Sequence, residues 1–311
     1  MNFNKVLYIF KIMLYISNIK MKDGEPTMIQ PSQVHPAPKK GYLNSDLEAF
    51  YILDQALPKF EYHYHDFYKL LIHIQGDVHY FIEGKEYALD PGDTLLINPG
   101  EIHKPSMRNN TIYERIIAYI SDSFFEGLAY YETDLKQCFS LAKSKQSHLV
   151  RSHTSNALLH HINEVLRCTF TTDDYGNHLL RRIKIEEYLI MINRVLNQED
   201  NSLIPPTTAN DKILQAIDFI NQHIDKELSI DTIAASLFLH PSYLMHLFKK
   251  ETGHTIGKYI NEKRLFISNQ YIKSGRTMTE ACYLAGFQNY GTFYQAYKKK
   301  YGASPKKTKI H

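Results

Sequence analysis

The 311-residue sequence has no tryptophan and only three cysteines. Cys138, Cys168 and Cys282 lie far apart and form no Cys-x-x-Cys pair, which excludes a clustered-thiolate metal site and indicates a reducing compartment. The sequence also lacks a phosphate-cradling glycine loop, a nucleophile–base pair and carboxylates paired for acid–base catalysis. We therefore predict a cytoplasmic protein that is not an enzyme and has no cofactor.

A long uncharged hydrophobic run is also missing. The first twenty residues, "MNFNKVLYIFKIMLYISNIK", are apolar, but Lys5 and Lys11 interrupt them. A membrane-spanning helix needs about 20 largely uncharged residues, and the small-residue cleavage site of a secretory signal is absent. We therefore expect no membrane association. Two interpretations of residues 1–27 stay open: translation begins at Met21 or Met28, or the segment is a disordered or amphipathic extension.

Charge is distributed unevenly along the chain. Residues 211–311 carry 15 lysines and arginines against 8 acids, a net charge of +7. The first 210 residues carry 21 basic and 25 acidic residues, a net charge of −4. A basic C-terminal domain beside a mildly acidic N-terminal one predicts a polyanion as partner of the former.

Between residues 42 and 121 the apolar residues alternate in short runs. "KLLIHIQG", "VHYFIEG", "KEYALDPG" and "TLLINPG" are separated by Gly, Pro and Asp turns, with a tight hairpin centred on Gly84. Short strands at this spacing predict an all-β barrel or sandwich.

The pattern then becomes helical. Apolar residues recur at helical spacing over 155–170, with Leu158, Ile162 and Val165, and over 178–196, with Ile185, Tyr188, Leu189 and Ile192. The polar stretch "NQEDNSLIPPTTAND" cannot continue a helix. We predict an extension at 1–27, a barrel at 28–150, packing or dimerisation helices at 151–197, a linker at 198–210 and an all-helical domain at 211–311. The fold class is α+β with two domains.

The helical domain contains one unit twice, in 228–260 and 277–307. In the first, Ser229 caps a short helix, Pro241 opens a second one, and Leu244, Leu247 and Phe248 face inward; in the second, we expect Thr279 as the cap, then Gly286, Phe287 and an inward Phe293 and Tyr297. Helix, tight turn, helix is the helix-turn-helix plan, whose second helix enters a DNA major groove. A continuous helix over 256–275 joins the units, so one polypeptide would bind two adjacent groove segments of double-stranded DNA.

This domain resembles the DNA-binding domain of the AraC/XylS family of bacterial transcription regulators. The resemblance rests on "FKKETGHTIGKYI", Gly286-Phe287, Tyr297-Lys298 and "YGASP". The departures are mild: Ala281-Cys282, Tyr297 and Thr308-Lys309 replace the family's usual residues. The resemblance implies a sequence-specific regulator, a homodimer, and RNA polymerase as a partner.

The resemblance also assigns base contacts, which suit the chemistry of the residues. Lysines at the ends of both second helices suit phosphate contacts. The predicted DNA-binding residues are Ser242, Met245, His246, Lys249, Lys250, Asn289, Tyr290, Thr292, Gln295, Lys298 and Lys299.

The predicted barrel contains "EYHYHDFYKLLIHIQG" and "LDPGDTLLINPGEIHKP". His63 and His65 alternate and face one side of a strand, and His103 follows a turn. The pattern resembles the cupin barrel of many AraC/XylS sensor domains. Metal-binding cupins add a carboxylate where this chain has Lys69, and an ammonium opposes a divalent cation, so we predict no metal.

A polar barrel mouth suits a small-molecule effector, and the resemblance favours a carbohydrate or related metabolite. The predicted effector-binding residues are His63, His65, Lys69, His79, Tyr80, His103 and Arg115. Two functions are weighed. The first is a ligand-responsive transcription regulator, which we expect to be an activator, and the second is a metal-dependent cupin enzyme with an accessory nucleic-acid module. Lys69 argues against the second.

Overall fold

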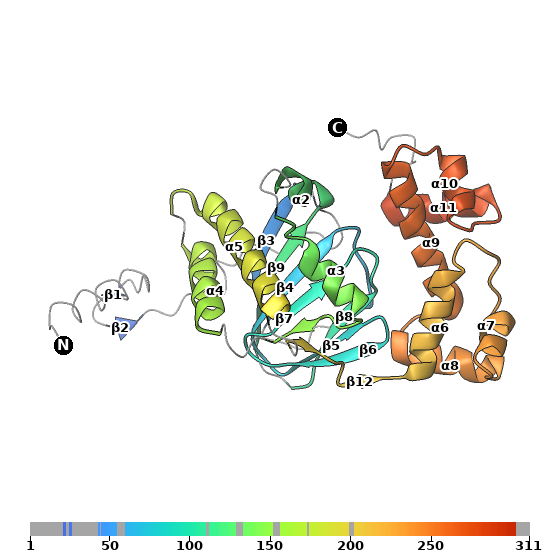
Figure 1. The fold of residues 1–311 in the computed structure, drawn as a ribbon, viewed down its shortest axis with the longest axis horizontal. Coiled ribbons are helices and arrows are strands. Elements are labelled where there is room, and N and C mark those ends of the chain that lie inside the picture. Colours follow the sequence, from blue (N-terminus) through green and yellow to red (C-terminus); the bar gives the residue numbers. More distant parts are fainter. Residues whose placement is uncertain are drawn as a thin grey trace.

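The computed structural model describes residues 21–22, 25–26, 43, 45–54, 60–109, 112–128, 133–151, 156–172, 174–198 and 202–302. A sheet-rich N-terminal domain is followed by a helical C-terminal domain (Figure 1). The predicted α+β two-domain class is therefore confirmed. The prediction for residues 1–27 lies outside the described residues, apart from the short strands β1 (Met21–Lys22) and β2 (Glu25–Pro26).

The N-terminal domain consists of two antiparallel sheets that form an open barrel. The larger has the strand order β11-β10-β7-β4-β9-β3, and the smaller has the order β12-β6-β5-β8. Among the described residues, the segment that precedes β4 pairs with β8 of the smaller sheet at an isolated bridge between His63 and His103. The strands are β3 (Leu47–Asp54), β4 (Tyr68–Gln75), β5 (Val78–Ile82), β6 (Lys85–Leu89), β7 (Thr94–Ile97), β8 (His103–Met107), β9 (Tyr113–Ile120), β10 (Leu149–Val150), β11 (Leu203–Ile204) and β12 (Thr208–Ala209).

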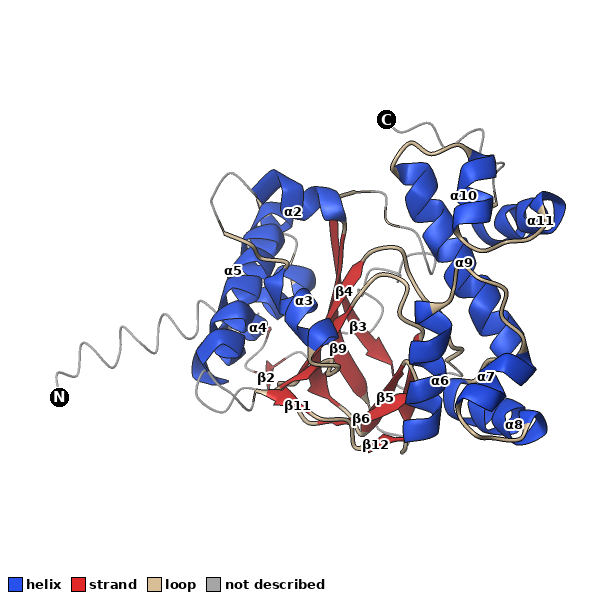
Figure 2. Cartoon of the chain, turned by 45° about the vertical axis from the view of Figure 1, so that its right-hand side comes forward, coloured by secondary structure: helices blue, strands red, loops and turns tan. Residues whose placement is uncertain are grey.

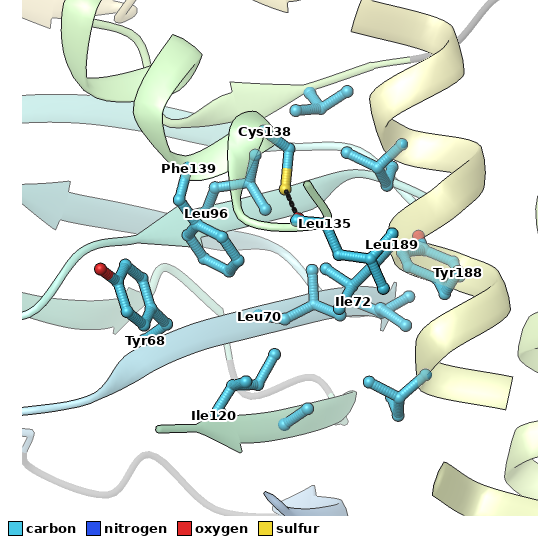
Figure 3. Close-up of a cluster of buried hydrophobic side chains, with 14 of the residues drawn as sticks. Tyr68, Leu70, Ile72, Leu96, Ile120, Leu135, Cys138, Phe139, Tyr188 and Leu189 are labelled. Carbon is cyan, nitrogen blue, oxygen red and sulfur yellow. Dashed lines mark hydrogen bonds between the residues drawn. The ribbon is translucent and has the colours of Figure 1, made fainter. Parts of the chain in front are cut away.

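Alternation along the strands explains why the larger sheet has two apolar faces. Leu71 and Ile97 point between the sheets, into a core shared with the smaller sheet. Leu70 and Leu96 point the other way and are covered by helices, as the close-up shows (Figure 3). Both faces are buried, so the strands of this sheet read as near-continuous apolar runs. The covering helices are α2 (Asp122–Leu128), α3 (Gln137–Ser144), α4 (Asn156–Thr171) and α5 (Asn177–Gln198).

The hairpin predicted at Gly84 is confirmed. β5 pairs with β6 across a turn in which both Glu83 (φ 48°) and Gly84 (φ 76°) are left-handed. Two positive φ values are what a two-residue hairpin needs to match strand twist. Glu83 is unusual because it carries a side chain in this conformation.

The two amphipathic helices are also present, as α4 and α5. Ile162 is buried, as are the four predicted residues of α5, Ile185, Tyr188, Leu189 and Ile192. The segment predicted as a linker, 198–210, contains β11 and β12, which extend the two sheets. Leu203 and Ile204 pair with β10 at one edge of the larger sheet, and β12 pairs with β6 at one edge of the smaller sheet. This segment is therefore part of the barrel's edge.

The C-terminal domain contains six helices among the described residues. Their bounds are α6 (Asp211–Gln222), α7 (Ile230–Ser236), α8 (Pro241–Thr252), α9 (Ile256–Lys273), α10 (Met278–Leu284) and α11 (Tyr290–Tyr301). Helix α9 runs between the two helix-turn-helix units, and each unit has its own apolar core (Figure 2).

Capping residues define the helix starts. Ser229 caps α7 as predicted, with Thr232 completing a capping box. The cap predicted at Thr279 is wrong: Thr277 caps α10, and Glu280 completes the box. Glu280 three residues after Thr277 fits this motif, whereas Thr279 has no such partner. No helix in the described part of the chain combines the length and apolar character that crossing a membrane requires.

Candidate functional site

The first candidate surface is one face of α8. Leu244 and Phe248 are fully buried and fix the orientation of this helix. The opposite face is exposed, and it carries polar and adaptable side chains at helical spacing. The exposed predicted residues are Ser242, Met245, His246, Lys249 and Lys250.

The second surface is the equivalent face of α11. Phe293 and Tyr297 are buried against α9 and α10, as predicted. The predicted residues on the other side are all exposed: Asn289, Tyr290, Thr292, Gln295, Lys298 and Lys299. Asn289 is also the N-cap of α11, because its side-chain oxygen accepts a hydrogen bond from the Thr292 backbone N–H at 3.0 Å. Its amide N–H groups are therefore the part that could contact a base.

The two surfaces lie at opposite ends of α9 (Figure 1). An 18-residue helix is roughly 27 Å long. Successive major grooves on one face of DNA are about 34 Å apart. Helix α9 is thus a rigid spacer of comparable length between the second helices of the two units.

The second candidate site is a cluster of imidazoles where the two sheets meet. Candidate ligand atoms of His63, His65 and His103 lie within 4.8 Å of one another. His63 Nδ1 lies 2.8 Å from the Glu61 carbonyl oxygen, and His103 Nδ1 lies 2.8 Å from the Glu101 carbonyl oxygen. In each ring the carbonyl fixes Nδ1 as the protonated nitrogen, so Nε2 is an acceptor. The His65 ring nitrogens are buried without a hydrogen-bond partner.

Lys69 lies against this cluster, beside His103. Its Nζ donates to the Tyr80 hydroxyl at 2.9 Å and lies 3.5 Å from His103 Nε2. Burial, with the charge of Arg115 added, lowers the pKa of Lys69 to about 7. Burial and the nearby Lys69 charge lower the pKa of His65 to about 2 and hold the pKa of His103 well below its usual value. The His65 and His103 imidazoles are therefore neutral.

Three imidazoles at this spacing resemble a metal-ligand set, but Lys69 changes the chemistry of the set. The ammonium stands where a carboxylate would complete the set, and it faces the same Nε2 that a metal would use. The residues present do not fit a divalent cation. The predicted absence of a metal remains a prediction, and it rests on Lys69.

Two predicted effector residues do not join this cluster. His79 lies beside Tyr80 on β5 and therefore faces the other side of the sheet, where its Nδ1 is 2.5 Å from Glu86 and 3.2 Å from Arg108. Arg115 points into the barrel but is held by Asp54 at 2.7 Å and by the Tyr113 ring at 3.9 Å. Strand alternation could have excluded His79 from the sequence, because Tyr80 is its neighbour.

The cluster is closed in this structure. Lys69 is 4% exposed and His103 is 0% exposed. A more open cavity of about 430 Å³ lies elsewhere, between β3 and the helices α4 and α5, where it is lined by Phe50, Phe170 and Arg181 among others. A small molecule reaches Lys69 only if part of the cover over the cluster moves.

Both halves of the chain match known families. Residues 48–192 match the AraC-like ligand binding domain, and residues 233–309 match a helix-turn-helix domain. The chain belongs to the AraC family of transcription regulators.

Full-length relatives of this AraC-family chain are regulators. The probable transcriptional regulator LumQ of Photobacterium leiognathi is 26% identical over 252 residues, which cover 78% of this chain and 90% of that protein. The lactose operon transcription activator of Staphylococcus xylosus is 26% identical, covering 71% of this chain and 76% of the relative. The transcriptional activator RhaS of Klebsiella pneumoniae is 22% identical, covering 82% and 90%. The chain is a regulator rather than an enzyme, so the cupin-enzyme alternative is set aside.

Sequence reasoning missed several exposed apolar residues of this AraC-family domain. Phe238, in the turn between α7 and α8, is 95% exposed and has a left-handed φ of 56°. Tyr243, next to Ser242 on α8, is 56% exposed. Tyr243 follows the predicted contact Ser242 directly, so a helical projection of α8 would have placed it near the predicted surface.

Proposed function

We propose that this AraC-family regulator is a homodimeric activator that responds to a carbohydrate or related metabolite. The DNA-binding part of the proposal rests on the pair of exposed polar faces on α8 and α11, fixed at the two ends of α9. Each buries one apolar face completely and leaves the opposite face free, as a helix in a major groove must. The proposed base contacts are Ser242, Met245, His246, Asn289, Tyr290, Thr292 and Gln295. The proposed phosphate contacts are Lys249, Lys250, Lys298 and Lys299.

The proposed effector site is the cluster of His63, His65, Lys69, Tyr80 and His103. It offers imidazole acceptors, an amine and a phenol, which together suit the hydroxyl groups of a sugar. The name of one relative, a lactose operon activator, supports this class of effector.

The proposed dimer contact is the exposed side of α5. Leu179, Ile183 and Ile190 are 62%, 46% and 36% exposed and are spaced four and seven residues apart. Such a stripe on a surface helix is typical of a helix that packs against another one. RNA polymerase is the proposed partner in activation, and the cytoplasm is the proposed location.

A calorimetric titration with a panel of sugars and sugar acids tests the effector assignment. We expect one compound to bind the wild type and to lose at least about 10-fold in affinity with Lys69→Met, because the amine and its hydrogen bond are gone. The matched control is Lys143→Met, an exposed lysine on α3. Binding that survives Lys69→Met unchanged would move the effector site elsewhere.

A further inference from the structure

The residues of segment 61–67, just before β4, face alternately into and out of the barrel. His63, His65 and Phe67 point inward: the His63 and His65 rings lie 4.6 Å and 5.0 Å from the His103 ring, and Phe67 stacks on His65 at 4.6 Å. The alternate residues of the segment point outward and contact the DNA-binding domain. They are Tyr62, Tyr64 and Asp66.

Tyr62 contacts the end of the first recognition helix. Its hydroxyl donates to the Glu251 carbonyl oxygen, in the last turn of α8, at 3.2 Å. Its ring lies 5.9 Å from the His254 ring and so close to Gly253 that a Cβ there would clash with it. Gly253 is also left-handed, with φ 71°, and ends α8.

Tyr64 contacts the helix that joins the two units. Its hydroxyl donates to the Glu262 carbonyl oxygen on α9 at 3.0 Å, and its ring meets the Phe266 ring edge-on at 6.2 Å. The Nζ of Lys300, in the last turn of α11, lies 3.8 Å from the centre of the same ring. Tyr64 is 6% exposed and belongs to the core of the first unit.

Asp66 extends the contact to the second recognition helix. Its carboxylate accepts from Lys273 at 2.7 Å and from Asn269 at 3.4 Å, both on α9. The Asn269 side-chain oxygen accepts in turn from the Tyr297 hydroxyl, on α11, at 2.7 Å. Three neighbouring outward side chains thus contact α8, α9 and, through Lys300 and Asn269, α11.

We propose that segment 61–67 transmits the state of the effector cluster to both recognition helices. The inference rests on the proposed function of the cluster. The cluster is closed, and His63 and His65 form part of its cover, so a ligand that reaches Lys69 displaces this segment. A displacement of the backbone at His63 and His65 moves Tyr62, Tyr64 and Asp66 with it, and these residues position α8, α9 and α11. The ligand would then favour one arrangement of the two units over another.

A double-mutant cycle tests the proposal without knowledge of the effector. The operator is first selected from a random duplex library with the full-length wild type. Operator affinity is then measured for Lys69→Met in the wild-type background and in a Tyr64→Phe/Asp66→Asn background. We expect the Lys69 substitution to change operator affinity at least about 5-fold in the wild-type background and less than about 2-fold when the polar contacts of Tyr64 and Asp66 are removed.

The matched control is Glu83→Gln. Glu83 also joins the barrel to α9, through Lys263 at 2.8 Å and the Tyr259 hydroxyl, but it lies in the β5–β6 turn and outside segment 61–67. In this background the effect of Lys69→Met should persist. Should Lys69→Met fail to fold, His63→Gln replaces it, because the His63 side chain is half-buried.

Two results would overturn the inference. The effect of the cluster substitution is the same with and without the Tyr64 and Asp66 contacts, or it is absent in the wild type although operator binding is intact. Sugar or sugar-acid binding that survives Lys69→Met unchanged in the calorimetric titration would instead reject the proposed function of the cluster, on which the inference rests, so the two failures are distinguishable.

Discussion

The Nζ of Lys69 lies 3.5 Å from Nε2 of His103, one of three imidazoles whose candidate ligand atoms lie within 4.8 Å of one another. A tethered amine thus lies where a bound cation would otherwise meet the same nitrogens. Burial, with the nearby Lys69 charge added, lowers the pKa values of His65 and His103, so both imidazoles stay neutral beside the amine.

Replacing Lys69 by glutamate should create a metal site. Lys69→Glu removes the opposing charge and adds the missing oxygen ligand, so we expect one equivalent of Co²⁺ to bind at least about 10-fold more tightly than to the wild type. Calorimetry and the cobalt absorption spectrum measure this. Lys69→Gln, which is neutral but a poor ligand, should fall between the two. Equal cobalt affinity in the wild type would show that Lys69 does not exclude the metal.

Because Lys69 is buried, the free energy of unfolding should depend on pH between about 7 and 10. Its folded-state pKa is about 7, whereas an unfolded lysine titrates near about 10.4. Between these values the unfolded chain binds more protons, so the free energy of unfolding rises with pH, by about 2 kcal/mol from pH 7 to pH 9. Urea unfolding of the wild type should show this rise and Lys69→Met should lack it, with Lys143→Met as control. Parallel pH profiles for the wild type and Lys69→Met would contradict the prediction.

Gln295 and Lys299 should affect DNA binding differently. Both are exposed on α11, but an amide can read a base edge, whereas an ammonium meets phosphate. Gln295→Ala should lose about 1–3 kcal/mol of binding free energy at one base pair and should bind equally well to all bases at that position. Lys299→Ala should weaken binding to every sequence and reduce the slope of log affinity against log salt concentration by about 1. Affinities across single-base operator variants separate the two. A uniform loss for Gln295→Ala would reject its base-reading role.

Charges on the exposed side of α5 should disrupt the dimer. Leu179→Glu combined with Ile183→Glu places like charges on the proposed contact, so sedimentation should show a monomer at micromolar concentration where the wild type is a dimer. Lys143→Glu, an exposed change on α3 and outside this stripe, should leave the dimer intact. A dimer that survives the double substitution would place the contact elsewhere.

The sequence predicts the local structure better than the contacts between distant segments. Strand alternation, the Gly84 hairpin and the buried faces of α5, α8 and α11 follow from periodicity, because each depends on neighbouring residues. The cap of α10 was misplaced by two residues, although Glu280 provides the capping-box signal for Thr277. The strands at 203–204 and 208–209 were missed because their pairing partners lie far away in the sequence.

The candidate sites show the same limit. The convergence of His63, His65 and His103 follows from alternation and a turn, but nothing in the sequence shows that Lys69 lies against His103. The contacts of Tyr62, Tyr64 and Asp66 with the DNA-binding domain span about 190 to 210 residues of chain. Such contacts depend on how the two domains meet, which no local pattern records.

The most direct test of the central claim is the effect of operator spacing on the affinity of the full-length protein. If α9 holds two recognition helices on one face of DNA, the selected operator contains two sequence blocks about one helical turn apart, and inserting about 5 base pairs between them turns one block to the opposite face. We predict that this insertion lowers affinity at least about 10-fold, whereas changing either block alone causes a smaller loss. An operator with a single block, or affinity that does not depend on the spacing, would contradict the account.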